Sequence, residues 1–337
     1  MTNNKITIVV DAMGGDGSPY KTLKGTEIFL SDYPSVDIIL VGNEKKIIDC
    51  ISLNKLKIFN HKIFHTEENV LNDDTPSTIL RNRKNSSIFK GLELIKDKKN
   101  FGFISAGNTA ALMILSRLIL GTIDGIDRPA ICSIIPTEND FSIMLDLGAN
   151  VSVDSKNLLQ FAVMGYCYHS ILKKNVNPKI GIINIGTENN KGYEFLQESS
   201  NMIQESFLKE YFIGFIEPNK ITSGNCDILI CDGYTGNIIL KTAEGMSQFI
   251  TQNLKKVFKK SLSNKIASAF LKKDLSEFKD EINPEKYNGA TFIGVNGVSI
   301  KSHGSATPYA FSCAINRCYD FIINDINEKI RLKFENI

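Results

Sequence analysis

The sequence has no tryptophan, only four histidines, and no CxxC pair among its seven cysteines. Scattered cysteines, odd in number, argue against a disulfide framework or a thiolate metal site and predict a reduced, cytoplasmic protein. No apolar run reaches the roughly 18 residues of a membrane span, and no long apolar segment typical of a signal peptide precedes the strand that begins by Ile6. We therefore expect any membrane contact to be peripheral.

Several catalytic signatures are missing as well. The GxSxG motif of α/β-hydrolases, the His-x4-Asp pair of glycerol-phosphate acyltransferases and a His/Asp/Glu spacing suited to a metal are all absent. Gly15 and Gly17 are followed by Tyr20, where the dinucleotide-binding pattern requires a third glycine. The net charge of +2 gives no reason to expect nucleic-acid binding. We expect no nicotinamide cofactor, no metal and no nucleic-acid partner.

The chain does contain a regular alternation of two hydrophobic patterns. Short β-branched runs, most of them bounded by Gly, Asn or Asp, predict buried parallel strands, and stretches of helical period lie between them. The runs lie at 6–10, 36–41, 101–105, 130–135, 142–147, 179–185 and 227–231, and the helical stretches at 19–31, 76–96, 107–120, 154–172, 190–208 and 303–323. This alternation predicts βαβ units with helices on both faces of a sheet. Residues 1–337 would form one α/β catalytic domain, or two lobes that share the sheet.

The segment 245–273 breaks this alternation. It holds seven lysines and no acidic residue, while apolar side chains such as Met246, Phe249 and Leu254 keep a helical spacing. This pattern predicts a basic amphipathic helix or helical pair, and with the acidic stretch that follows it predicts a helical hairpin over 245–287. The hairpin could pack on a second subunit or rest on an anionic membrane surface.

Glycines, hydroxyls and charged side chains follow most of the predicted strands. The most informative stretch is DAMGGDGSP at 11–19, which has three glycines and two aspartates within seven residues, directly after an apolar run. Such a turn can point backbone N–H groups at an anion. Similar loops are RNRKNSS at 81–87, SAGNT at 105–109, GTENNKG at 186–192, DGYTGN at 232–237 and KSHGS at 301–305. Each alone could be an ordinary turn, but together they predict a crevice for phosphate or a phosphorylated substrate.

Taken in order, these motifs resemble those of a known family over nearly the whole chain. They are DAMGGD at 11–16, TPSTILRNRKNSS at 75–87, SAGNT at 105–109, RPAI at 128–131, LDLGAN at 145–150, NIGTENNKG at 184–192, CDGYTGNIILKTAEG at 231–245 and KSHGSA at 301–306. The set resembles the phosphate acyltransferases of bacterial phospholipid synthesis, which make acyl phosphate from acyl carrier protein and inorganic phosphate. The chain departs from the family at Ala110, where a glycine is usual.

The resemblance implies a Rossmann-like three-layer α/β/α fold with a mostly parallel sheet, related to phosphotransacetylase and isocitrate dehydrogenase-like folds. It implies a homodimer without metal or nucleotide cofactor, with acyl carrier protein as acyl donor and inorganic phosphate as acceptor. It also implies peripheral contact with an anionic membrane, on the cytoplasmic face, where a downstream glycerol-3-phosphate acyltransferase would consume the product. In that setting the segment 245–273 is a candidate for receiving the acidic carrier protein as well.

Transfer of an acyl group from a thioester to phosphate depends on binding and orientation more than on proton transfer, because phosphate is already anionic and a thiolate leaves readily. We predict Lys301, His303 and Asp232 as the catalytic residues. His303 would donate a proton to the thiol or a hydrogen bond to the carbonyl, and Asp232 would orient loops and cations. The predicted substrate- and phosphate-binding residues are Asp11, Gly14, Gly15, Asp16, Lys84, Ser86, Ser87, Asn108, Thr109, Lys191, Asn237 and Lys241. Which loop holds phosphate and which holds the pantetheine arm stays open.

The remaining candidates for chemistry are assigned to the core. His61, His65 and His169 are expected to be structural, and Cys132 and Cys231 lie on predicted buried strands. Two other functions fit the same sequence. One is a short-chain phosphotransacylase that uses coenzyme A thioesters, and the other is a non-catalytic, membrane-associated organiser of lipid synthesis.

Overall fold

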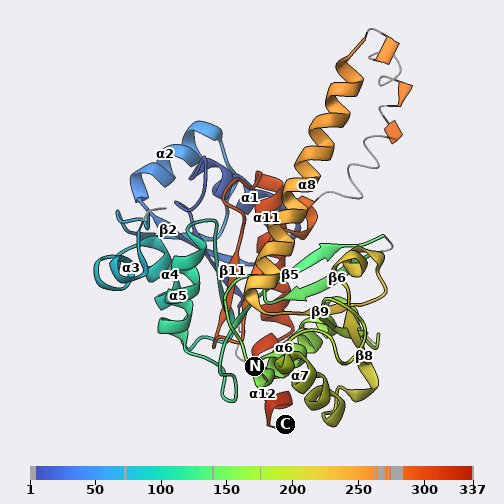
Figure 1. Ribbon diagram of the computed structural model, residues 1–337. Helices are drawn as coiled ribbons and strands as arrows, with labels where there is room; N and C mark the ends of the chain where they lie inside the picture. The colour runs from blue at the N-terminus through green and yellow to red at the C-terminus, as the bar shows by residue number, and fades with distance from the viewer. Residues whose placement is uncertain are drawn as a thin grey trace.

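A computed structural model describes residues 5–71, 74–138, 140–174, 176–261, 263–264, 270–271, 273–274 and 284–335. Within these residues, eleven strands form one continuous sheet. In order across the sheet they are β3 (His61–His65), β2 (Asp37–Gly42), β1 (Thr7–Asp11), β4 (Phe101–Ser105), β11 (Val298–Lys301), β10 (Ala290–Ile293), β5 (Ala130–Pro136), β6 (Phe141–Leu145), β9 (Ile228–Ile230), β7 (Ile180–Ile183) and β8 (Phe212–Ile216). The C-terminal strands therefore lie between the N-terminal half and the middle of the chain (Figure 1).

Helices cover both faces of this sheet, and the alternation of side chains along each strand explains why. Ile8 and Val10 of β1 join one core cluster and Val9 joins the other, so both faces of the strand are apolar. One face is covered by α1 (Tyr20–Asp32), α2 (Glu44–Asn54), α6 (Ser155–Leu172), α7 (Glu194–Glu205), α11 (Pro308–Ile323) and α12 (Ile326–Phe334). The other is covered by α3 (Pro76–Asn82), α4 (Ser87–Ile95), α5 (Thr109–Leu120) and the start of α8 (Gly233–Lys259). The predicted three-layer α/β/α fold is confirmed.

The direction of the strands divides the sheet into two halves. Strands β3, β2, β1, β4 and β11 are parallel to one another, and so are β6, β9, β7 and β8. Between them, β10 is antiparallel to both β11 and β5, and β5 is antiparallel to β6. The two parallel halves consequently run in opposite directions. The loops after β1, β4 and β11 therefore leave the sheet at one end of the strands, and those after β6, β9 and β7 leave it at the other.

Several predicted elements differ from those observed. The run 130–135 was expected to be parallel, but β5 is antiparallel to both of its neighbours. The helical stretch 76–96 divides into α3 and α4, because Ser86 starts a new helix. The helix expected over 303–323 begins only at Pro308. Strands β3, β8, β10 and β11 were not predicted, and short 3-10 segments also occur at Lys209–Tyr211, Pro218–Ser223 and Pro284–Tyr287.

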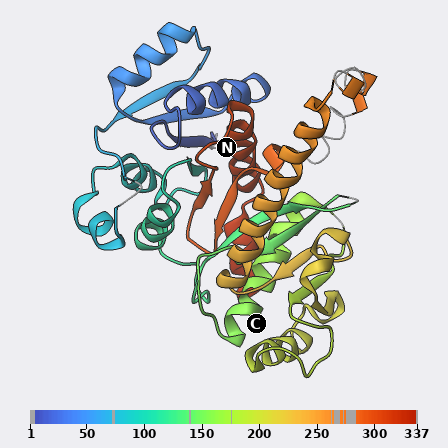
Figure 2. The same cartoon turned by 45° about the horizontal axis from the view of Figure 1, so that its top comes forward.

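The basic segment begins inside α8, a helix of 27 residues that starts on the sheet and then leaves the body of the protein. Figures 1 and 2 both show its outer part standing clear of the domain. Of α8, only Gly233 and Gly236 are buried, which agrees with this position. The second arm of the hairpin predicted over 245–287 falls mostly outside the described residues. Among the described helices, none has the length and apolar character that a membrane crossing requires.

Candidate active site

Three of the predicted loops meet at the carboxyl ends of β1, β4 and β11, which are neighbours in the sheet. The backbone N–H of Asp16 donates to the carbonyl of Gly304 at 2.7 Å, and the N–H of Ser302 donates to the carbonyl of Ser105 at 2.9 Å. Gly14 fits this meeting point because a Cβ there would lie 2.6 Å from Oδ2 of Asp11 and 2.7 Å from the backbone N of Gly107. The approach of the loops therefore depends on the absence of a side chain at Gly14.

Asp11, the last residue of β1, is the acidic centre of this meeting point and is only 1% exposed. Its carboxylate accepts hydrogen bonds from the hydroxyl of Ser105 at 2.6 Å and from the backbone N–H of Met13 at 3.1 Å. Burial raises the pKa of Asp11, and hydrogen bonds from Ser105, Ser87 and the local backbone oppose that rise. The Ser105 hydroxyl also accepts from the N–H of Gly107 at 2.9 Å, so Asp11 fixes the second loop as well as the first.

Lys301, the last residue of β11, supplies a buried cation beside Asp11 and is 9% exposed. Its Nζ donates to the carbonyl of Ala106 at 3.4 Å and also to the carbonyl of Ser302. Burial lowers the pKa of Lys301 to about 8, and the negative charge of Asp11 opposes this fall. A buried ammonium next to glycine-rich loops is suited to hold an anion, because its charge is poorly screened there.

His303 lies in the same loop, exposed, and not at a helix start as the sequence suggested. The N-cap of α11 is Thr307, four residues further on. The backbone N–H of Ser305 donates to Nδ1 of His303 at 3.2 Å, so the neutral ring carries its proton on Nε2. The side chain of Asn288 fixes this loop, since it accepts from the N–H of His303 at 3.0 Å and donates to the Ser302 hydroxyl at 2.8 Å. Asn288 was not predicted, and no motif in the sequence marks it.

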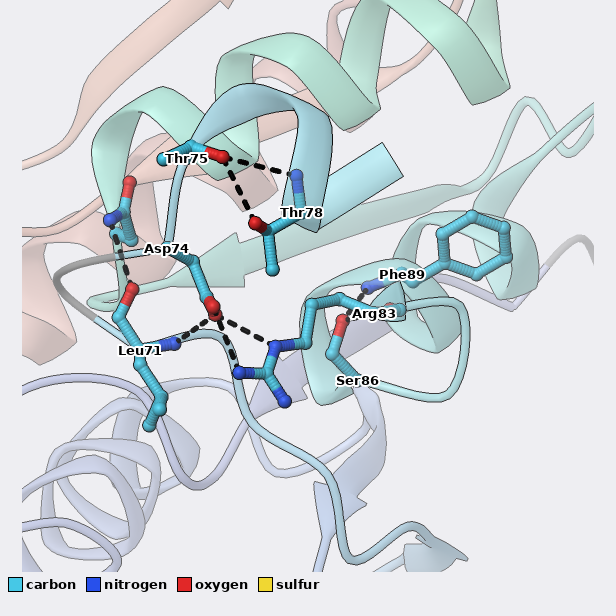
Figure 3. A network of polar contacts seen from close by, with 8 residues as sticks. Leu71, Asp74, Thr75, Thr78, Arg83, Ser86 and Phe89 are labelled. Atoms are coloured by element: carbon cyan, nitrogen blue, oxygen red, sulfur yellow. Dashed lines mark hydrogen bonds and ion pairs between the residues drawn. The ribbon is translucent and has the colours of Figure 1, made fainter. Parts of the chain in front are cut away.

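The basic stretch 81–87 contributes mainly structure (Figure 3). Arg83 makes a two-bond ion pair with Asp74, both bonds at 2.8 Å, and this pairing lowers the pKa of Asp74. Ser86 caps α4 by accepting from the N–H of Phe89 at 3.3 Å. Lys84 is exposed on the turn between α3 and α4. Of the three phosphate-binding residues predicted in this stretch, Ser87 is the one that reaches the carboxylate of Asp11.

Asn108 and Thr109 lie at the start of α5, immediately after the Ser105 to Gly107 loop. Asn108 is the N-cap of α5 and accepts from the N–H of Ala111 at 3.0 Å. Thr109 is exposed in the first turn. The positive end of the α5 dipole thus faces the same region as the Lys301 ammonium, which favours an anion there. Ala110 lies inside the helix, where alanine is well tolerated because of its high helix propensity.

The other predicted site residues lie in the opposite half of the sheet. Asp232 caps α8 by accepting from the N–H of Thr235 at 2.8 Å, and Asn237 packs beside Gly148. Lys191 and Lys241 are exposed and each pairs with a glutamate three residues away. The sequence predicted one crevice for all these loops, but the opposite strand directions produce two groups. No described contact joins these four residues to Lys301, and their roles stay predictions.

The second group is organised by Asp146, a fully buried residue that follows β6 directly. Its Oδ1 accepts from the N–H groups of Ile131, Gly148 and Ala149 at 3.0–3.1 Å. Its Oδ2 accepts from the backbone and side-chain N–H groups of Asn150 at 2.7 and 2.9 Å. The motif LDLGAN contributed to the family resemblance, but the sequence did not identify this role for Asp146.

The thiols and the other histidines are core or surface residues, as expected for a structural role. Cys132 and Cys231 are buried, and burial holds the pKa of each thiol well above its usual range. His169 is buried near Asp227, and burial lowers its pKa. In the described part of the chain, no three His, Cys, Asp or Glu side chains gather as metal ligands would.

Known proteins resemble this chain over nearly its whole length. The family model described as "Fatty acid synthesis protein" matches residues 6–329. A phosphate acyltransferase from Clostridium tetani is 40% identical over 327 residues, covering 96% of this chain and 97% of that protein. One from Coxiella burnetii is 39% identical over 334 residues, covering 98% and 97%.

The solved structures that resemble the chain support the fold. A phosphotransacetylase from Streptococcus pyogenes superimposes with a TM-score of 0.65 at 15% identity, over 95% of both chains. A branched-chain phosphotransacylase from Enterococcus faecalis gives a TM-score of 0.59 at 11% identity, over 94% of this chain and 99% of that one. The near-complete coverage at 39–40% identity and the matching family model assign the chain. It belongs to the phosphate acyltransferase family of fatty acid synthesis proteins.

Proposed function

We propose that the protein transfers a long-chain fatty acyl group from acyl carrier protein to inorganic phosphate, giving acyl phosphate for phosphatidic acid and phospholipid synthesis. The observation that carries this proposal is the buried Lys301 ammonium beside Asp11, at the meeting point of three strand-end loops. The names of the relatives support transfer to phosphate. The choice of acyl carrier protein as the donor, and of a long acyl chain, rests on the resemblance of the sequence motifs to this family.

In this reaction a phosphate oxygen forms a bond to the thioester carbonyl carbon, and the carbon–sulfur bond then breaks. The thiolate leaves and takes up a proton, so the products are acyl phosphate and the free thiol of the carrier. Lys301 and the N-terminal turn of α5 hold the phosphate charge and offset the negative charge that develops on the carbonyl oxygen. His303, with its proton on Nε2, is placed in an exposed loop where it can donate to the departing sulfur.

The outer part of α8 suggests two further partners. From Met246 to Val257 it exposes an apolar stripe, and Lys255, Lys256 and their neighbours add positive charge toward the end. A stripe of this length normally has a partner surface. We propose that it packs against a second copy of the chain in a homodimer, and that the lysine-rich end rests on the anionic cytoplasmic face of the membrane. There a glycerol-3-phosphate acyltransferase would receive the acyl phosphate.

The first experiment traps acyl phosphate with hydroxylamine after incubation with palmitoyl acyl carrier protein, with and without inorganic phosphate. The proposal expects a hydroxamate that depends on phosphate and needs no added metal. Product from acetyl or butyryl coenzyme A, and none from the carrier protein, would instead identify a short-chain phosphotransacylase, the alternative favoured by the phosphotransacetylase-like fold. Sedimentation velocity and vesicles with or without phosphatidylglycerol test the dimer and the membrane contact.

A further inference from the structure

A groove of about 460 Å³ lies outside the Lys301 cluster and has no assigned role. It runs between α3 and α5 on one side and the loops before β5 and after β6 on the other. Its lining is Leu80, Met113, Ile114, Arg117, Leu118, Pro129, Ala149 and Asn150. We call this the Arg117 groove. The groove adjoins the Asp146 loop at Ala149 and Asn150, and it contacts α5, the helix that starts at the Lys301 cluster.

The position of α5 connects the Arg117 groove to the active site. The helix begins at Thr109, directly after the loop that contacts Asp11 and Lys301. The groove residues Met113 and Arg117 are four positions apart, so they lie on the same side of the helix. At a rise of about 1.5 Å per residue, Arg117 stands roughly 13 Å along the axis from Asn108. An extended group that reaches the Lys301 cluster can thus lie along α5.

The chemistry of the lining selects the occupant. Most of the lining side chains are apolar, but Asn150 contributes an amide whose Nδ2 donates to Asp146 and to the carbonyl of Pro129, so its Oδ1 is the atom that can accept from a ligand's N–H. Arg117 is exposed, and no carboxylate among the described residues pairs with it. An alkyl chain in the groove would take water from this guanidinium and offer it no partner, which is costly. An arm that is apolar, carries amides and ends in an anion matches the apolar lining, the Asn150 amide and the Arg117 guanidinium.

We propose that the Arg117 groove binds the phosphopantetheine arm of the acyl donor, with the guanidinium of Arg117 on the arm's phosphate and the thioester at the Lys301 cluster. The inference rests on the proposed function, since it needs a thioester donor. The same arm occurs in acyl carrier protein and in coenzyme A, so the groove serves either source. Arginine suits this position because its guanidinium can form two parallel bonds to phosphate oxygens.

The test compares two soluble donors that differ only in the phosphate, an octanoyl thioester of pantetheine and the same thioester of 4′-phosphopantetheine. The wild type should prefer the phosphorylated donor in kcat/KM by about tenfold or more, the usual effect of one charge-assisted contact. Arg117→Ala should remove this preference mainly by raising KM, and Arg117→Lys should keep part of it. Lys45→Ala, which removes an exposed cation on α2, is the matched control and should keep it fully.

Binding of the two unacylated arms, measured by calorimetry, gives a second readout that does not depend on turnover. Loss of the phosphate preference in both readouts supports the proposal. An Arg117→Ala variant that weakens both arms equally, or that changes only the dependence on acyl-chain length, overturns it and assigns the groove to the alkyl chain or to packing. If the arms bind through Arg117 and no donor yields acyl phosphate, the proposed function fails and the groove assignment stands. Repeating the comparison with octanoyl acyl carrier protein and octanoyl coenzyme A shows which source uses the contact.

Discussion

The pKa of Lys301 makes the activity of this enzyme depend on pH in a way that a single substitution should change. Burial lowers this pKa to about 8, and the negative charge of Asp11 limits the fall. If the ammonium holds phosphate, the contribution of its charge to kcat/KM should be level well below pH 8 and should fall as pH rises through that value. Asp11→Asn removes the opposing charge, so the pKa of Lys301 should drop further and the fall should begin at lower pH.

The size of the effect follows from the charge that is lost. A neighbouring opposite charge typically changes a pKa by about one unit or more, so we take a new value of roughly 7 for the variant. At pH 8 the charged fraction of Lys301 then falls from about one-half to about one-eleventh, which predicts a further loss of about fivefold in kcat/KM. At pH 6 the two proteins should have nearly the same charged fraction. The loss is therefore a function of pH rather than a uniform decrease.

The assay is hydroxamate trapping between pH 6 and 9, with Asp49→Asn on α2 as a control that removes an exposed carboxylate. Unfolding of the protein cannot explain the predicted loss of kcat/KM at high pH. Because the folded pKa of Lys301 lies below its ordinary 10.5, the unfolded chain binds more protons between about pH 8 and 10.5. Stability from this group therefore rises with pH while activity falls. A profile that is unmoved by Asp11→Asn, or level through pH 9 in the wild type, would refute the role given to Lys301.

Three further substitutions test the rest of the site. Asp146→Ala removes the acceptor of five N–H bonds and should lower the free energy of unfolding by about 3 kcal/mol or more in urea titrations; a loss under 1 kcal/mol would show that the loop holds without it. Gly14→Ala places a Cβ 2.6 Å from the Asp11 carboxylate and should lower kcat by about a hundredfold while far-ultraviolet circular dichroism stays native; near-normal kcat would contradict the tight meeting of the loops. Cys231→Ala, in the core, should cost about 1 kcal/mol of stability and leave kcat unchanged; a large loss of activity in a stable variant would mean that the thiol takes part.

The sequence predicted the alternating fold and a crevice lined by loops that follow strands, because both depend on local pattern. Apolar runs such as 6–10 mark buried strands, and polar loops after neighbouring parallel strands meet at one end of the sheet. The loop of Asp11 and Gly14 does meet the loop that follows Lys301, although the strand β11 that ends at Lys301 was not predicted.

The direction of the strands could not be predicted in the same way. The local sequence of a short run such as 290–293 does not indicate which strand it pairs with or in which direction. The pairing is decided by distant parts of the chain. The reversal at β10 and β5 therefore went unseen, and with it the separation of Asp232 and Lys191 from Lys301.

Hydroxyl and basic side chains at helix starts were the second source of difference. A serine that caps a helix and a serine that binds phosphate look alike in sequence, since both lie before a helical stretch. Ser86 is a cap, and Arg83 is committed to Asp74, nine residues earlier. The predicted helical stretch 76–96 does begin where α3 begins, at Pro76, but the turn that ends α3 was not predicted.

Lys301 is the residue on which the proposed transfer to phosphate depends most directly. The measurement that tests it is the phosphate-dependent formation of acyl phosphate from palmitoyl acyl carrier protein by the wild type and by Lys301→Ala, with circular dichroism on both. We expect the variant to lose at least about a hundredfold in rate while it keeps its fold, because a buried charge that holds the nucleophile is removed. A folded Lys301→Ala variant with near-normal rate, or a wild type whose product does not depend on phosphate, would contradict the account.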